Sequence, residues 1–347
     1  MKGIQKMLEE RALPPLLERE EMLRILQEEE YGFLPPPPLA TEYKVTENCI
    51  PNFCAGKAFA ERVDVTVTLK EGVFTFPFYA AIPTKEGPHP VFVHISFRDA
   101  VPDRYMPTEE LIDEGYAVLF FCYKDVTSDD GDFRNGLAGV LYPDGVRREG
   151  NAPGKIALWA WAAHRVMDWA EKDGRLDGAR CAVCGHSRLG KTALLAAATD
   201  ERFSLGISND SGCSGAAITR EKVGETVADI CRVFPYWFCE NYQKYVNNEA
   251  AMPFDQHFLV AAIAPRCAYI ASAVEDVWAD PLSEMLAAHA AAPAWGEVLG
   301  FRGEDRAPQV GDEFHLGAIG YHLRAGTHYY SREDWLRAIS FRRKKGI

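Results

Sequence analysis

A serine stands where a strand-like run gives way to a helix-like run. Ser187 follows the apolar segment RCAVCG (residues 180–185) and precedes an Ala/Leu-rich segment over residues 189–200. Such a turn lifts a hydroxyl out of a sheet and aims it at a helix N-terminus, where free N–H groups can stabilise an oxyanion. The usual elbow is Gly-x-Ser-x-Gly, but here Leu189 takes the second glycine position. The pattern also fits a helix-capping serine, and the partners downstream favour a nucleophile.

A serine hydroxyl needs a base to be nucleophilic at neutral pH. In serine hydrolases with a strand–turn–helix elbow, the histidine comes last in the chain, on a loop after the final strand. His328 lies in such a place, after the run AIGYHLR (residues 318–324), and we predict it to be the base. His322 lies inside that run and is predicted to be a core or sheet-face residue. His186 is predicted to pack, and His257 to be structural.

An acid must fix the histidine tautomer and stabilise the imidazolium. Asp210 ends the strand-like run LGISND, and Asp276 follows the strand-like run CAYIASA. Both can face the histidine loop, because the carboxyl ends of parallel strands share one edge of a sheet. Glu275 and Asp280 are adjacent candidates, and each of these carboxylates also fits an ordinary surface position.

The elements around these residues alternate between strands and helices. Continuous apolar runs at residues 89–97, 116–123, 180–185, 205–210, 267–273 and 318–324 predict strands covered on both faces. Residues 107–115, 156–172 and 189–200 predict helices. The alternation predicts an α/β fold with a mostly parallel, doubly wound sheet flanked by helices. Two alternating runs, residues 61–70 and 73–83, predict an antiparallel pair.

The predicted organisation is one catalytic domain with an N-terminal extension. Residues 1–60 form a helical and antiparallel extension that packs on the core, with a charged helix followed by the extended run Pro35–Pro38. Residues 61–347 form the hydrolase domain. Its aromatic-rich, irregular stretch over about 213–257 is predicted to be an insertion near the active site.

Composition excludes several classes of partner. The chain has 347 residues, with 38 Lys+Arg against 50 Asp+Glu and a net charge of −12. Because no basic cluster is present, we expect no nucleic acid partner, and no apolar run long enough for a membrane span is present. Most of the nine cysteines lie in apolar runs and predict free thiols. Cys181 and Cys184 should point to opposite sides of one strand, which argues against a metal or redox site.

The N-terminus has no apolar segment typical of a secretory signal. We therefore expect a cytoplasmic protein, and a secreted protein from which a signal has been trimmed is the alternative. We expect neither a cofactor nor a metal, and the oligomeric state stays open.

The segment Gly185-His186-Ser187-Arg188-Leu189-Gly190-Lys191 resembles the G-C-S-R-x-G-K signature of glucuronoyl esterases, carbohydrate esterase family fifteen. The likeness runs from about residue 90 to 335. It includes residues 209–217, the FPYWFC segment, residues 255–257, residues 276–280 and the late Gly-Thr-His. The resemblance implies an α/β-hydrolase that cleaves the ester between the 4-O-methyl-glucuronate of xylan and lignin alcohols.

The resemblance also implies roles for individual residues. Ser187 would be the nucleophile and His328 the base, and Arg188 would stabilise the oxyanion. Lys191 would contact sugar hydroxyls. Glu225 falls at the family's sugar-binding glutamate and Trp278 at its tryptophan over the sugar.

Two departures from the family pattern matter. The family commonly has Glu at the Asp210 position, and some bacterial relatives carry the acid at the Asp276 position, which we favour slightly. Residues 94–99, His-Ile-Ser-Phe-Arg-Asp, differ from the family's usual stretch and leave the leaving-group side open.

We therefore predict a serine carboxylic-ester hydrolase that acts on a carbohydrate ester through an acyl-enzyme. The leading substrate candidate is a 4-O-methyl-glucuronoyl ester. The alternatives are a deacetylase of acetylated xylan or xylo-oligosaccharides, and a non-catalytic uronate-binding protein.

Overall fold

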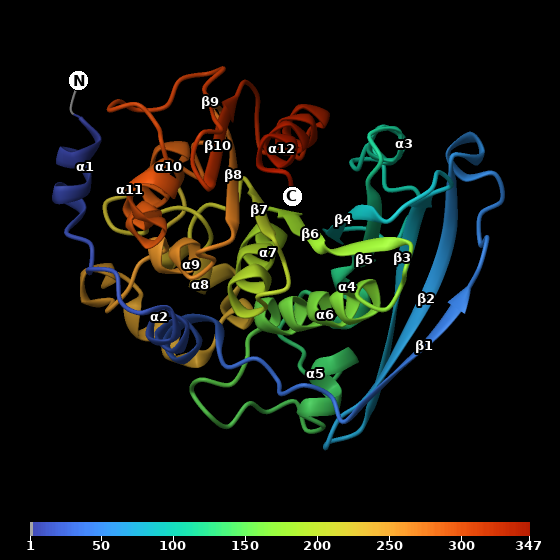
Figure 1. Ribbon diagram of the computed structural model, residues 1–347. Helices are drawn as coiled ribbons and strands as arrows, with labels where there is room; N and C mark the ends of the chain where they lie inside the picture. The colour runs from blue at the N-terminus through green and yellow to red at the C-terminus, as the bar shows by residue number, and fades with distance from the viewer. Residues whose placement is uncertain (1–2) are drawn as a thin grey trace.

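One twisted sheet runs through the computed structural model, which describes residues 3–347 (Figure 1). Ten strands lie in the order β1-β2-β3-β5-β4-β6-β7-β8-β10-β9. Their bounds are β1 Ala40–Thr46, β2 Ala58–Thr68, β3 Val73–Pro83, β4 His89–Ser96, β5 Ala117–Cys122, β6 Leu176–His186, β7 Leu205–Asn209, β8 Cys267–Ala273, β9 Glu313–Phe314 and β10 Ile319–Arg324.

The strands from β5 through β4, β6, β7 and β8 to β10 are parallel, whereas β1, β2 and β3 pair antiparallel with one another, β3 with β5 and β9 with β10. The predicted mostly parallel sheet and the predicted antiparallel pair are thus confirmed. The crossovers place the carboxyl ends of β4, β6, β7, β8 and β10 at one edge, where ligands of such sheets bind.

Helices cover both faces of the sheet. On one face lie α6 (Lys155–Ala170), α7 (Arg188–Thr199) and α10 (Pro281–Ala291), and on the other lie α3 (Thr108–Asp113) and α12 (Arg332–Lys345). Alternate residues of β4 serve the two layers: Val91 and Val93 join the larger core, and Phe92 contacts Trp335 of α12. The shorter helices are α4 (Tyr123–Val126), α5 (Gly136–Leu141), α8 (Val227–Val233), α9 (His257–Ala261) and α11 (Gly296–Leu299).

The two cysteines of β6 show the same alternation. Cys181 is buried in the larger core and Cys184 in the core under α12, so they lie on opposite sides of the sheet, as predicted. All nine cysteines are free thiols.

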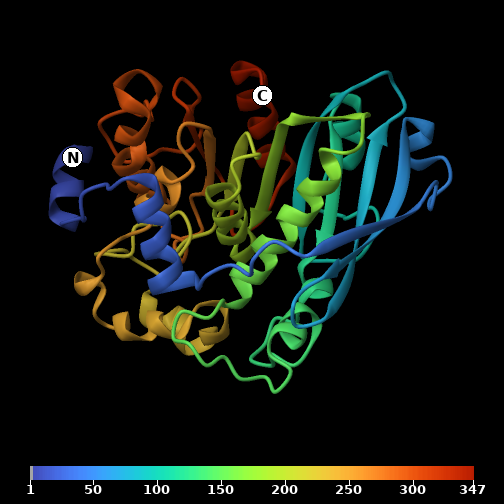
Figure 2. The same cartoon turned by 60° about the horizontal axis from the view of Figure 1, so that its bottom comes forward.

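The N-terminal segment lies on the side of the sheet that α6, α7 and α10 cover (Figure 2). Helices α1 (Ile4–Arg11) and α2 (Arg19–Leu26) pack on α10 and α9, and the π-helical turn Gln27–Tyr31 closes α2. The chain then crosses α6, where the Trp161 indole donates to the Pro36 carbonyl at 3.2 Å, and enters β1.

The division at residue 60 stays a prediction, but β2 begins at Ala58 and runs across it. β1 pairs with β2 along its whole length, from Ala40 opposite Thr68 to Thr46 opposite Arg62, so residues 40–46 and 58–60 belong to the main sheet. The helices in the stretch 213–257 are all short. None of the described helices is long and apolar enough to cross a membrane.

Candidate active site

The turn between β6 and α7 holds Ser187 in a strained backbone conformation. Its φ of 57° and ψ of −127° are unusual for a residue with a side chain, and such strain is concentrated at functional sites. The Ser187 N–H donates to the Asn209 carbonyl of β7 at 2.8 Å, which fixes the turn against the sheet. The predicted strand-to-helix position of the serine is therefore confirmed.

The close contacts of two glycines, Gly185 before the serine and Gly190 after it, explain the departure from the elbow pattern. A Cβ on Gly185 would lie 2.2 Å from the Leu189 carbonyl oxygen, because the helix turns back directly over the strand end. Leu189 itself is fully buried in the larger core, whereas Gly190 lies against Ser208 and Asn209. The close approach to β7 thus falls one residue later than in the usual pattern.

His328 and Asp276 form a short hydrogen bond. The His328 Nδ1 lies 2.6 Å from Asp276 Oδ2, and in this bond the N–H donates to the carboxylate. Asp276 is 5% exposed, whereas the His328 side chain is 45% exposed, so one end of the imidazole is anchored and the other faces the open site. This is the geometry that a base and its orienting acid require.

The His328 ring also contacts the neighbour of the serine. Its centroid lies 4.4 Å from that of His186, which directly precedes Ser187. His186 is held by Asn209, with Nδ1 and Oδ1 2.6 Å apart, and burial lowers its pKa to about 3. His186 is therefore neutral near pH 7 and packs, as predicted. A hydrogen bond from Ser187 to the free His328 nitrogen stays a prediction.

Backbone hydrogen bonds tie the acid loop to the histidine loop. The Val274 N–H donates to the Arg324 carbonyl and the Glu275 N–H to the Gly326 carbonyl, both at 3.0 Å. The parallel pairing of β8 with β10 thus extends beyond the strand ends and sets the spacing of His328 and Asp276.

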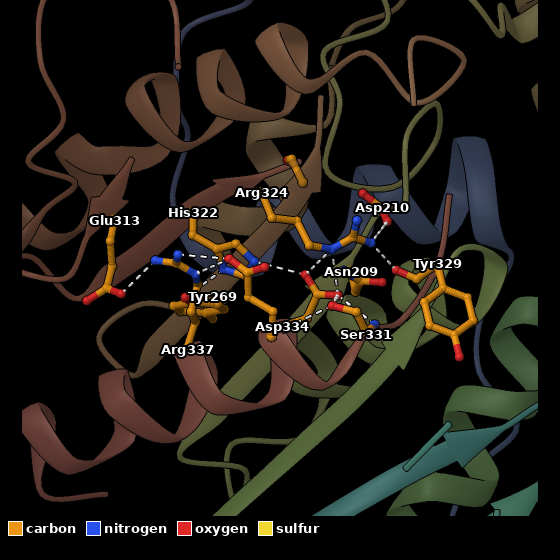
Figure 3. Close-up of polar contacts among 12 residues, drawn as sticks. Asn209, Asp210, Tyr269, Glu313, His322, Arg324, Tyr329, Ser331, Asp334 and Arg337 are labelled. Carbon is orange, nitrogen blue, oxygen red and sulfur yellow. Dashed lines mark hydrogen bonds and ion pairs between the residues drawn. The ribbon is translucent and has the colours of Figure 1, made fainter. Parts of the chain in front are cut away.

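Arg324, which the sequence analysis did not single out, anchors the histidine loop through hydrogen bonds to its backbone, of which Figure 3 shows the one to Tyr329. Its guanidinium donates to the carbonyls of Ala325, Thr327 and Tyr329, which flank His328. It is also bound by Asp334, whose two oxygens lie 2.9 Å from Arg324 Nε.

Asp334 links this anchor to the helix and the sheet. It accepts from Ser331 at the start of α12 and from the buried His322, which also contacts the Tyr269 hydroxyl at 2.8 Å. An arginine at the end of the last strand, with a capping acid ten residues later, is the only sequence signal for this network. His322 is fully buried in it, which confirms its prediction as a core residue.

Asp210, the other predicted acid, differs from Asp276 in its contacts and in its pKa. It is 1% exposed, lies at a φ of 44°, and its Oδ2 is 3.4 Å from Arg324 Nη2, while Oδ1 has no hydrogen-bond partner within residues 3–347. Burial, followed by the charges of Glu284, Asp334 and Asp276, raises the pKa of this carboxyl well above its usual range. This shift favours the uncharged form of Asp210, which makes it less suited than Asp276 to stabilise an imidazolium.

Of the two adjacent candidates, Asp280 has a structural role and Glu275 lies at the surface. Asp280 caps α10 by accepting from the Ser283 N–H at 3.2 Å and also accepts from Val223, whereas Glu275 is exposed. Ligand atoms of Asp210, Asp276 and His328 lie within 4.8 Å of one another. Because the His328 Nδ1 is already hydrogen-bonded to Asp276, this group fits a triad better than a set of metal ligands.

Arg188 lies in an aromatic cage beside the serine. Its guanidinium carbon is 4.6 Å from the Trp237 ring and 5.7 Å from the Phe97 ring, and Nη1 forms an ion pair with Asp129. Its Nε is buried with no partner among the described residues. An unpaired buried donor is costly, by about 1–3 kcal/mol, and marks a place where a ligand oxygen would fit.

The three predicted sugar-binding residues lie near one another, and their role stays a prediction. The Glu225 N–H donates to the Trp278 carbonyl at 3.0 Å, and Gly224, at a φ of 71°, lets the two loops approach. Trp278 is 54% exposed, so its indole is available to stack on a ring.

Lys191 is 3% exposed, and its ammonium donates to the Ser211 carbonyl. Burial lowers its pKa, although the nearby Glu225 charge opposes this. Lys191 is thus not a solvated helix residue, and Trp278 is not a core aromatic. His257 is buried and bonded to the Pro14 carbonyl at 2.9 Å, which fits its predicted structural place.

The strand order, the elbow serine after β6, the acids after β7 and β8 and the histidine after β10 define an α/β-hydrolase with a serine site. The family model for fungal glucuronyl esterases matches residues 63–300. The chain belongs to the glucuronyl esterase family, and the predicted family and fold are confirmed.

Solved and characterised relatives agree. A glucuronoyl esterase from Solibacter usitatus superposes with a TM-score of 0.84 at 31% identity, covering 94% of this chain and 91% of that one. A promiscuous esterase of carbohydrate esterase family 15 from a marine bacterial metagenome gives 0.82 at 32% identity, covering 93% and 90%. A carbohydrate esterase from an unknown prokaryotic organism is 43% identical over 236 residues, 67% of this chain and 54% of that protein.

A 4-O-methyl-glucuronoyl methylesterase from Podospora anserina is 27% identical over 309 residues, which are 85% of this chain and 58% of that protein. The chain thus spans a little over half the length of these two relatives.

Proposed function

We propose that this chain is a serine esterase that hydrolyses a carbohydrate carboxylic ester, specifically a 4-O-methyl-glucuronoyl ester. The observation that carries the proposal is the 2.6 Å hydrogen bond between His328 and Asp276 beside the strained Ser187 turn. Family membership and the names of the relatives support the substrate class.

In the first half-reaction, the Ser187 Oγ attacks the ester carbonyl while His328 takes the hydroxyl proton. Asp276 holds the opposite N–H and stabilises the imidazolium. The C–O bond to the alcohol breaks, His328 protonates the leaving oxygen, and the uronoyl group stays on the serine. Water then attacks the acyl-enzyme with His328 as base, releasing the uronic acid and restoring Ser187.

The oxyanion is stabilised at the start of α7. The Arg188 backbone N–H, directly after the nucleophile, has no intrahelical acceptor, because the first N–H groups of a helix never have one. The Arg188 Nε, which has no partner among the described residues, supplies a further charged donor from the same residue. The positive charge of Arg188 suits this chemistry because negative charge develops on the carbonyl oxygen.

The sugar side supports a uronate rather than an acetate. In a uronoyl ester the sugar carries the acyl carbon and stays on the enzyme during the covalent stage, so the site must hold it. Trp278 provides an exposed ring for stacking, and Glu225 lies beside it with a carboxylate that can accept from sugar hydroxyls. An acetate group needs neither.

The test is a substrate panel: methyl 4-O-methyl-glucuronate, acetylated xylose and a nitrophenyl acetate, with Ser187→Ala as the inactive control. We expect turnover of the glucuronate ester, its loss in the variant, and no effect of a chelator. Faster turnover of acetylated xylose would assign a deacetylase. Failure of a fluorophosphonate to label Ser187, together with no turnover, would assign a binding protein.

A further inference from the structure

Asp129, in the loop after α4, is the carboxylate that pairs with Arg188. Its side chain is 7% exposed, compared with 24% for Arg188, and its Oδ2 accepts from Arg188 Nη1. Because both groups are largely shielded from water, their attraction is screened less than that of a surface pair. The proposed catalytic steps involve Arg188 but not Asp129, and the contacts of this carboxylate indicate that it does more than neutralise a charge.

Two further donors fix the carboxylate of Asp129. The Tyr123 hydroxyl of α4 donates to Oδ2 and the Trp237 indole N–H donates to Oδ1, both at 2.8 Å. The Tyr236 hydroxyl also donates to the Asp129 backbone carbonyl at 3.1 Å. These donors come from segments that are far apart in the sequence. The carboxylate is therefore a fixed point against which the guanidinium is held, and it does not depend on Arg188 for its place.

A buried lysine also holds the loop that carries Asp129. Lys155, at the start of α6, is fully buried. Its ammonium donates to the Thr127 hydroxyl at 2.7 Å and to the Asp132 carbonyl at 2.8 Å. The loop is thus tied to α6 on both sides of Asp129, so its position is set by the core of the protein.

The aromatic rings and Asp129 constrain the Arg188 guanidinium in complementary ways. Its central carbon lies 4.6 Å from the Trp237 ring centroid and 5.2 Å from that of Phe234, and these two rings stack with centroids 3.8 Å apart. Contacts with ring faces are weakly directional, whereas a charge-assisted hydrogen bond is directional. The bond from Nη1 to Asp129 therefore sets the orientation of the guanidinium. It leaves the Nε–H, which has no partner within residues 3–347, available to a ligand oxygen.

We propose that Asp129 is a positioning residue for the oxyanion: it orients Arg188 so that the Nε–H is directed at the ester carbonyl oxygen before negative charge develops there. The inference rests on the proposed function, whose oxyanion donor it places. A donor that is fixed in advance needs no reorganisation as the charge develops, and this is the main advantage of an oxyanion site over water. Asp129 acts through Arg188 and not on the ester itself.

The test measures kcat and KM of Arg188→Ala, Asp129→Ala and Asp129→Asn on the methyl glucuronate ester and on nitrophenyl acetate. Removing one oxyanion donor lowers kcat by about 10²–10³-fold, and we expect a loss of this size in Arg188→Ala. A displaced donor costs less than a missing one, so kcat should fall by about 10–100-fold in Asp129→Ala. KM should change little, because the transition state is affected more than the bound substrate. Both esters should lose alike, since both form an oxyanion.

The double variant of Asp129→Ala and Arg188→Ala distinguishes positioning from a structural role. If Asp129 acts through Arg188, its removal costs nothing more once Arg188 is absent, and the double variant should have the kcat of Arg188→Ala alone. Losses that multiply in the double variant, or an unchanged kcat in Asp129→Ala, would overturn the proposal. Thermal unfolding reports the fold of each variant, and where Asp129→Ala unfolds, the same comparison uses Asp129→Asn, which keeps the size of the side chain.

The matched control is Asp130→Ala in the same loop. Asp130 is exposed, and its carboxylate accepts from the Ser128 hydroxyl at 2.6 Å and from the Asp132 N–H at 2.9 Å, so it bonds within the loop. Asp130→Ala should keep the kcat and KM of the wild type on both esters. A loss equal to that of Asp129→Ala would assign both carboxylates to the stability of the loop and overturn the proposal.

Labelling of Ser187 by a fluorophosphonate separates this inference from the proposed function. The reaction places negative charge on the phosphoryl oxygen, so it uses the same oxyanion donors without a sugar. If the wild type turns over neither ester but is labelled at Ser187, and Asp129→Ala lowers the labelling rate by about 10-fold or more, only the proposed function fails. Equal labelling rates in the wild type and Asp129→Ala, with turnover of the glucuronate ester by the wild type, would overturn only the inference.

Discussion

Replacing Asp276 by Asn removes the charge of the carboxylate that is hydrogen-bonded to His328. The carboxylate is 5% exposed and lies 2.6 Å from His328, so its charge acts on the imidazole with little screening by water. If the amide oxygen faces His328, the hydrogen bond survives without the charge. If the amide N–H₂ faces it, the imidazole takes the other tautomer and cannot accept the serine proton.

The size of the effect follows from this geometry. In serine proteases the equivalent change lowers kcat by about 10⁴-fold, which corresponds to about 5.5 kcal/mol of transition-state stabilisation. Asp210 is nearby, but burial and the neighbouring carboxylates raise its pKa and favour its uncharged form, so it is a poor replacement for the lost charge. We therefore expect Asp276→Asn to lower kcat by about 10³–10⁴-fold and Asp210→Asn by less than about 10-fold.

The assay is turnover of the methyl glucuronate ester near pH 7, with circular dichroism and thermal unfolding as checks on the fold. A severe loss in Asp210→Asn with a mild loss in Asp276→Asn would reverse the assignment of the acid. Mild losses in both single variants and a severe loss in the double variant would show that the two carboxylates share the role.

Three further predictions concern the anchor, the core and the sugar side. Arg324→Ala should lower the unfolding free energy by about 3–5 kcal/mol, and Tm with it, because Asp334 keeps a buried charge without its partner. It should also lower kcat, because the histidine loop loses its anchor. Unchanged Tm and kcat would contradict this. Glu30 is fully buried and burial raises its pKa to about 8, so the folded state holds a proton that the unfolded state releases above about pH 4.5. Stability should then fall by about 3–4 kcal/mol more in the wild type than in Glu30→Gln between pH 5 and pH 8, as urea unfolding would measure; parallel pH curves would refute it. Trp278→Ala should raise KM for the glucuronate ester by about 10-fold and spare nitrophenyl acetate, and equal losses on both would point to a generic esterase.

Much of the fold and part of the site follow from the sequence because their signals are local. Continuous apolar runs predicted the buried parallel strands, since a strand covered on both faces must be apolar at every position. The same local logic put Ser187 at a strand-to-helix turn. The β1 strand was not predicted, because its exposed edge position leaves only weak alternation in residues 40–46.

Family resemblance added the substrate class and the sugar-side residues, which composition and spacing alone do not contain. The catalytic roles of Ser187, His328, Asp276, Arg188 and the others stay predictions until the variants are measured. The cytoplasmic location and the domain division at residue 60 also stay predictions.

The family pattern favoured Asp276 slightly over Asp210, but only the tertiary structure shows the physical difference between the two acids. Asp210 and Asp276 both follow strands of one sheet. Their difference depends on groups far away in the chain: His328 provides the hydrogen bond of Asp276, whereas Arg324, Glu284 and burial set the state of Asp210. Desolvation and charge are sums over spatial neighbours, so no local pattern reports them.

The same reason applies to the anchor of the histidine loop. Arg324 supports this loop through carbonyls that have no sequence signature. The sequence by itself determined which elements form and which residues end them. Which of those ends face one another, and with what charge, was decided by the packing of the sheet, because long-range contacts alone set distance and dielectric.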